Sequence, residues 1–134
     1  MNNNIDLTKA LSQITQTDDI FQQPDIAHIF IHHHKVIQSH LLPGLKVEVK
    51  EYDDHIEINT TVEKDSKIDK PVHMCFGMLP EQGIQKIIIH NDIGENASVS
   101  FLAHCAFPNA VDIQHIMEGT IQVGKNARYR YLER

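Results

Sequence analysis

A phrase that recurs in the second half of the chain constrains the fold more than any other feature of this sequence. Similar heptapeptides occupy Val62–Ile68, Ile93–Val99 and Val123–Tyr129, and their starts lie 31 and then 30 residues apart. Each has a β-branched residue, a turn with glycine or charge, Asp or Asn, a small residue and an apolar strand starter. A fixed period in this range is typical of stacked supersecondary units.

The repeated unit consists of strands, because apolar and polar residues alternate on either side of each turn. In the second repeat, Val99 and Phe101 share one face of the expected strand. Pro108 marks a corner after it, since proline cannot donate to a β-ladder. Two strands and two corners would make one turn of a flattened β-solenoid. We therefore expect Ile68, Val99 and Tyr129 to stack inside, on strands about 4.8 Å apart.

The amino-terminal segment has a different pattern. Residues 5–16 have the i, i+3, i+4, i+7 apolar spacing of a helix, with Asp6 as the expected N-cap. This helix is expected to cover one end of the solenoid. Residues 26–31 and 35–38 then read as two strands of a hairpin, joined by His32, His33 and His34 in a solvated turn. The sequence predicts a single domain, with a helical cap over residues 1–24 and strands over residues 25–134.

Size and charge limit the function classes. A chain of 134 residues is long enough for one core, and a net charge of −6 disfavours nucleic acid as a partner. The sequence has neither the roughly 20 apolar residues of a membrane helix nor the apolar stretch of a signal peptide. With two cysteines and no export signal, a cytoplasmic location without a structural disulfide is expected.

Two blocks of the sequence resemble a known family. Ala103–Ala110, followed by Ile121–Ala127, is similar to the core of the SufB/SufD iron–sulfur cluster assembly proteins, and Val72–Gly77 looks like the preceding coil in small members. The resemblance covers roughly residues 25–134. It implies a right-handed parallel β-helix and a non-enzymatic scaffold or partner subunit in cluster assembly. A SufC-like ATPase or another assembly subunit is the implied partner, although the helical domain that grips SufC in longer relatives has no counterpart here.

Cys75 and Cys105 are the first candidates for contact with sulfur, iron or a transient iron–sulfur cluster. Thiolates anchor such clusters and attack in sulfur transfer. A spacing of one period would bring the two thiols onto adjacent turns of the solenoid. Alternation along the strands nevertheless predicts that Cys105 faces the core with Val99, whereas Cys75 faces the other way with His73. Simple packing is the alternative for both, because free cysteines are often buried.

Histidines and acids complete the candidate ligand set. His73 and His104 are the expected auxiliary metal ligands, and His115 is a third candidate, since imidazole and thiolate together bind zinc or iron. Their spacings form no metal signature, so the sequence favours surface histidines over metal ligands. Glu118 and Glu133 offer carboxylates, but nothing in the sequence pairs them.

Two other functions remain open at this stage. The chain can be a structural protein-interaction module without metal, or a small metal-binding jelly-roll protein, a fold that shares short strands and internal glycines. A solenoid also needs covered ends, because an uncovered last turn exposes backbone and core. Homodimerisation through the carboxy-terminal turns is therefore expected.

Overall fold

The computed structural model describes residues 3–15, 17, 19–20 and 23–134. Helix α1 (Asn3–Thr15) comes first, and no helix among the described residues is long and apolar enough to cross a membrane. The strands that follow are β1 (His28–His32), β2 (Lys35–His40), β3 (Leu45–Glu51), β4 (Ile56–Val62), β5 (Val72–Gly77), β6 (Gln82–Ile93), β7 (Ser98–Ala106), β8 (Asp112–Val123) and β9 (Arg128–Glu133).

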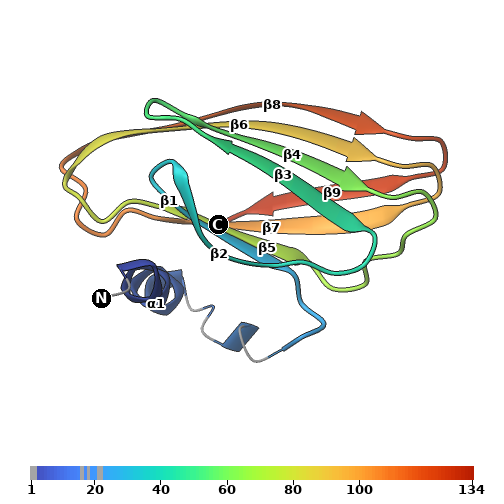
Figure 1. Cartoon of the computed structure of the whole chain (residues 1–134), viewed down its shortest axis with the longest axis horizontal. Helices are drawn as coiled ribbons and strands as arrows, with labels where there is room; N and C mark the ends of the chain where they lie inside the picture. The colour runs from blue at the N-terminus through green and yellow to red at the C-terminus, as the bar shows by residue number, and fades with distance from the viewer. Residues whose placement is uncertain (1–2, 16, 18, 21–22) are drawn as a thin grey trace.

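These strands form two open sheets that face each other (Figure 1). One sheet has the order β2-β1-β5-β7-β9, and the other has the order β3-β4-β6-β8. The β1–β2 pair, which is the predicted hairpin, and the β3–β4 pair are antiparallel, whereas the remaining neighbours are parallel. The predominance of strands is confirmed. Both sheets are mixed rather than wholly parallel, and neither closes into a barrel.

Apart from the β1–β5 pair, which aligns His28 with His73, the parallel pairs align residues about thirty positions apart. Val99 pairs with Tyr129, and the bridge from Lys67 to Ser98 continues the same register one repeat earlier. Ile68, Val99 and Tyr129 all pack in the main core between the sheets. The predicted stacking of these equivalent positions is therefore confirmed. The stacking arises because each strand places alternate side chains inward, so that an in-register neighbour meets the same core.

The corners between the two sheets stack as well. Asp65, Asn96 and Asn126 have positive φ angles of 66°, 63° and 60°. Asn and Asp tolerate this left-handed backbone better than most other residues. The side-chain amide of Asn96 donates to the carboxylate of Asp65 at 3.0 Å, which ties two corners together. Gly94 is needed beside them, since a Cβ there would lie 2.7 Å from the backbone nitrogen of Lys64.

Helix α1 covers the outer face of the five-stranded sheet instead of an end (Figure 1). Leu11 is fully buried against Phe30 and Ala106, in a second core outside the sandwich. The expected end cap is therefore wrong, because β1 is buried on both faces and Phe30 on its outer face needs a cover. The helix begins at Asn3, so Asp6 lies in its first turn rather than at the N-cap. The predicted helix end at residue 16 and the side chain of Ile14 fall outside the described residues.

Candidate metal centre

The register of the β5–β7 pair separates the two cysteines. Cys75 pairs with His104, and Cys105 pairs with Phe76. Residues paired in a parallel ladder share a face, while neighbours along a strand face opposite ways. Cys105 therefore faces the main core, whereas Cys75 faces the layer beneath α1. The predicted facing of the two side chains holds, but the two thiols do not form a common site.

Cys75 is buried under the helix. Its thiol is 1% exposed and lies 3.8 Å and 3.9 Å from the hydroxyls of Thr15 and Thr17. Burial raises the pKa of Cys75 to about 11, against a smaller opposing effect of the two hydroxyls. The side chain is consequently a neutral thiol that packs in the outer core, as free cysteines often do.

His73 and His104 lie on the same outer face as Cys75. The Nδ1 atom of His73 and the Nε2 atom of His104 are 3.1 Å apart, so one ring donates a hydrogen bond to the other. Burial lowers the pKa of both rings, and that of His104 falls to about 4. The two predicted ligands thus meet as a neutral pair. Their role as metal ligands stays a prediction, as does contact of Cys75 with iron or sulfur.

A different group of side chains converges on the inner face of the sandwich. Cys105 on β7, His115 on β8 and Glu133 on β9 bring their ligand atoms within 4.8 Å of one another. Glu133 points inward because it pairs with the buried Ala103. The Cys105 thiol donates to the Glu133 carboxylate at 3.6 Å. Three consecutive strands therefore supply one thiol, one imidazole and one carboxylate. Glu118, the other candidate acid, lies outside this cluster.

The electrostatics of Cys105 favour the thiol in the metal-free protein. Burial raises the pKa of Cys105 to about 12, and the negative charge of Glu133 adds to the increase. A cation placed between the two groups would favour the thiolate and use the carboxylate as a second ligand. Cys105 is therefore a neutral thiol, and a metal ion bound at this cluster would convert it to the thiolate.

His115 supplies the observation that most favours a metal. Its Nδ1 atom lies 2.8 Å from the Oε1 atom of Gln85, whereas its buried Nε2 atom has no hydrogen-bond partner among the described residues. Burial lowers the pKa of His115, so the ring is neutral near pH 7. An unpartnered buried nitrogen costs about 1–3 kcal/mol unless a ligand satisfies it. Thiol, imidazole and carboxylate together fit Zn²⁺ or Fe²⁺, with further positions open.

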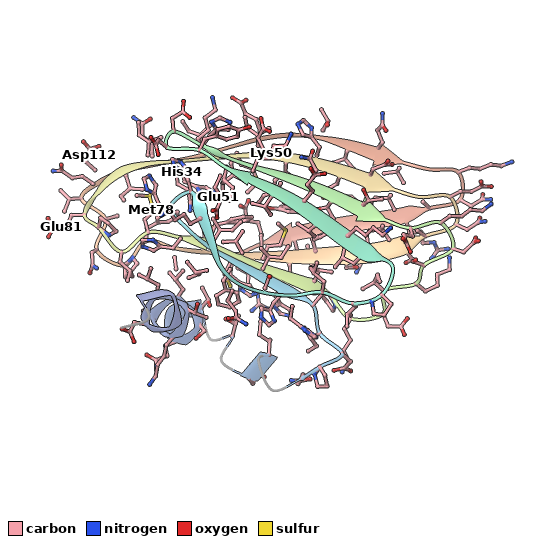
Figure 2. The ribbon with its side chains drawn as sticks, in the orientation of Figure 1. His34, Lys50, Glu51, Met78, Glu81 and Asp112 are labelled. Atoms are coloured by element: carbon pink, nitrogen blue, oxygen red, sulfur yellow. The ribbon has the colours of Figure 1, made fainter. Side chains whose placement is uncertain are left out.

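The three consecutive histidines have structural roles instead. His32 accepts a hydrogen bond from the backbone of Leu79 at 3.2 Å. His34 lies where the hairpin meets the second sheet (Figure 2), with Nδ1 on the Asp53 carbonyl and Nε2 on the Lys86 amide. The expected solvated turn is therefore wrong for His34, which is 5% exposed and clips the hairpin to two other segments.

Sequence reasoning named all three residues of the cluster without grouping them. His115 follows Gln85 by thirty residues, so the repeat period predicts that the two pair across β6 and β8, as they do. Gln85 was missed entirely, because an isolated glutamine in an apolar run carries no chemical signature. To predict the inward position of Glu133, one would need the register of the last strand, which pairs Glu133 with Ala103.

Comparison with known proteins gives two archaeal relatives. An iron-sulfur cluster assembly SufBD family protein of Methanocaldococcus jannaschii is 41% identical over 90 residues, which make up 67% of this chain and 28% of that protein. A protein of the same description from Pyrococcus horikoshii is 35% identical over 106 residues, or 79% of this chain and 32% of that protein. This chain belongs to the SufBD family. The matched segment spans about a third of the length of these SufBD relatives.

The remaining comparisons add no further relatives. No family model matches the chain, and no solved structure matches it significantly. The SufBD relationship therefore rests on the two archaeal proteins, whose names indicate a general role in iron–sulfur cluster assembly.

Proposed function

We propose that this chain is a non-catalytic assembly factor for iron–sulfur clusters, in the cytosol, and that Cys105, His115 and Glu133 contact iron or cluster cargo. The convergence of these three side chains carries the proposal, together with a buried Nε2 atom of His115 that has no hydrogen-bond partner in the described part of the chain. The names of the SufBD relatives support the cargo. A scaffold that holds iron briefly needs ligands close to solvent, and Glu133 is exposed while Cys105 and His115 are half-buried.

The architecture that we propose for this role is a right-handed parallel β-helix. Its support is the parallel pairing of β5, β7 and β9 in one sheet and of β4, β6 and β8 in the other. In this arrangement Cys105, His115 and Glu133 lie in the last turn of the β-helix. A SufC-like ATPase or another assembly subunit remains the proposed partner by kinship alone.

We further propose that a second copy of the chain covers the end formed by β8 and β9. Each is the last strand of its sheet within the described residues. Ile121 is 50% exposed and Val123 is 49% exposed, although they pair with the buried residues Asn91 and Ile93. Apolar inward positions next to unpaired strand edges are typical of a surface that associates.

Self-association is tested by the mass in solution. Light scattering at micromolar concentration should give twice the 15.3 kDa of one chain. Replacing Ile121 and Val123 together by lysine should return the protein to the monomer mass, because two charges cannot be buried unpaired. A wild-type protein with the monomer mass would refute this part of the proposal.

Anaerobic reconstitution with Fe²⁺ and sulfide tests the proposed cargo. The wild-type protein should become coloured and retain iron after desalting. Cys105→Ser and His115→Ala should each reduce bound iron at least tenfold, since each removes one ligand. Visible absorbance and elemental analysis measure the result.

Cys75→Ser is the matched control, because it alters the other thiol on the opposite face of the sheet. It should retain the colour and the iron. If Cys75→Ser or His73→Ala abolishes binding while Cys105→Ser does not, the cargo lies on the outer face and our assignment is wrong. A colourless wild-type protein without metal favours the interaction module. A single zinc held by histidines alone favours the metal-binding jelly-roll alternative.

A further inference from the structure

We propose that Gln85 is a positioning residue that fixes the tautomer of His115, so that Nε2 is left as the bare nitrogen of a ring that lies beside Cys105 and Glu133. This inference rests on the proposed metal-binding function and deepens it. Gln85 does not belong to the ligand cluster. Its side chain is fully buried in β6, directly beside His115 in β8.

The orientation of the Gln85 amide follows from its partners. Its Nε2 atom lies 2.9 Å from the carbonyl oxygen of His33 and 3.1 Å from the carbonyl oxygen of Gly77. A carbonyl oxygen can only accept, so both bonds require the NH₂ group at this end of the amide. The other end, Oε1, must then point at His115. The two carbonyl partners therefore determine which end of the Gln85 amide is nitrogen and which is oxygen.

The tautomer of His115 follows in turn. Gln85 Oε1 is an acceptor, so the Nδ1 atom of His115, 2.8 Å away, must carry the proton. A neutral ring has only one N–H, and Nε2 is left with a lone pair. That lone pair has no protein partner among the described residues, and a ring nitrogen of His115 lies within 4.8 Å of the Cys105 and Glu133 ligand atoms. A ring of the opposite tautomer would present a proton to the metal.

The backbone that holds Gln85 is itself fixed. His33 has a positive φ of 55°, and its amide donates to the Gly77 carbonyl at 2.9 Å. The imidazole of His33 also bonds the carbonyl of Ile84, next to Gln85 in the chain, at 2.9 Å. The β1–β2 hairpin and the end of β5 therefore hold the glutamine that orients the histidine. Such outer hydrogen bonds commonly change metal affinity 10–100-fold.

Nitrogen NMR of the metal-free protein tests the inference directly. In the ¹⁵N-labelled wild type, His115 should show a protonated Nδ1 and a non-protonated Nε2. Gln85→Met keeps the length of the side chain but removes the acceptor, so the ring should populate both tautomers and the Nε2 signal should shift toward the protonated value. Zn²⁺ affinity, measured by competition with a chelating dye, should fall about 10–100-fold in the same variant.

Asn91→Leu is the matched control, since Asn91 is a buried amide on the same face of β6 that bonds Tyr129 instead of a histidine. It should leave both the His115 signals and Zn²⁺ affinity unchanged. A protonated Nε2 in the wild type overturns the inference, even if Gln85→Met fails to fold. An unchanged His115 tautomer in a folded Gln85→Met variant also overturns it. The tautomer is read without metal, so a protein that binds no iron defeats the proposed function without altering this result.

Discussion

Acidification from pH 7 to pH 4 should remove much of the stability of this protein. His28 is 3% exposed, and its burial lowers its pKa from 6.5 to about 4, with smaller effects of His40 and His73. The unfolded chain binds a proton near pH 6.5, whereas the folded chain resists it until about pH 4. The free energy of unfolding therefore falls as the pH drops through this window.

The expected loss from His28 alone is about 3 kcal/mol by pH 4, at 1.36 kcal/mol per pKa unit. His32 and His34 add to it, because burial lowers their pKa values as well. Domains of this size have about 5–15 kcal/mol in total, so the effect is large. Urea unfolding followed by circular dichroism at several pH values measures it.

Variants at two histidines identify the source of this pH dependence. His28→Leu should make the slope between pH 6.5 and pH 4 shallower, since this residue no longer titrates, while His104, whose pKa is also lowered to about 4, still contributes. The exposed His90 gives the control, and His90→Leu should leave the slope unchanged. Equal free energies of unfolding at pH 7 and pH 4 in the wild type would contradict the prediction.

Gly77→Val should destabilise the fold by about 3 kcal/mol. A Cβ at this position would lie 2.5 Å from the carbonyl oxygen of Ala106 and 2.7 Å from Leu11. Leu11 can rotate, but the Ala106 carbonyl belongs to the neighbouring strand and accepts from the Met78 amide at 3.2 Å. Overpacking against a fixed backbone costs about 1–3 kcal/mol, and valine adds two methyl groups to the Cβ.

The midpoint and slope of urea unfolding measure this change. Thr61→Val is the control, because Thr61 is exposed on β4 and valine is a good strand former. It should alter the free energy of unfolding by no more than about 0.5 kcal/mol. A Gly77→Val protein as stable as this control would show that β7 can move away from β5.

The stacking of repeats was predictable, because Ile68, Val99 and Tyr129 follow one period and a strand repeats its facing every two residues. The position of α1 was not. A strand buried on both faces, such as β1, needs a cover on each side, but its sequence does not say which segment provides the cover. The structure selects the helix through Leu11, which packs on Phe30.

The residue types of the candidate site and the facing of its cysteines were predictable, but the grouping of Cys105 with His115 and Glu133 was not. Cys75 and Cys105 are thirty residues apart, but β5 and β7 pair residues 29 apart, and this single residue places the thiols on opposite faces. Register at this accuracy depends on the lengths of both corners, which no periodicity fixes. The pairing of Gln85 with His115 lies in the other sheet, where the offset is thirty.

The stacked corners at Asp65, Asn96 and Asn126 also restrict how such a chain can change its length. An extra residue inside β7 would turn every later side chain of the strand to the opposite face and move the Cys105 sulfur out of the sandwich. Duplication of a whole repeat of about thirty residues would leave each side chain on its present face. The fold should therefore tolerate the insertion of complete repeats better than the insertion of single residues within a strand. Shorter insertions belong in the exposed connection at residues 109–111, outside the ladders that fix the orientation of the thiol.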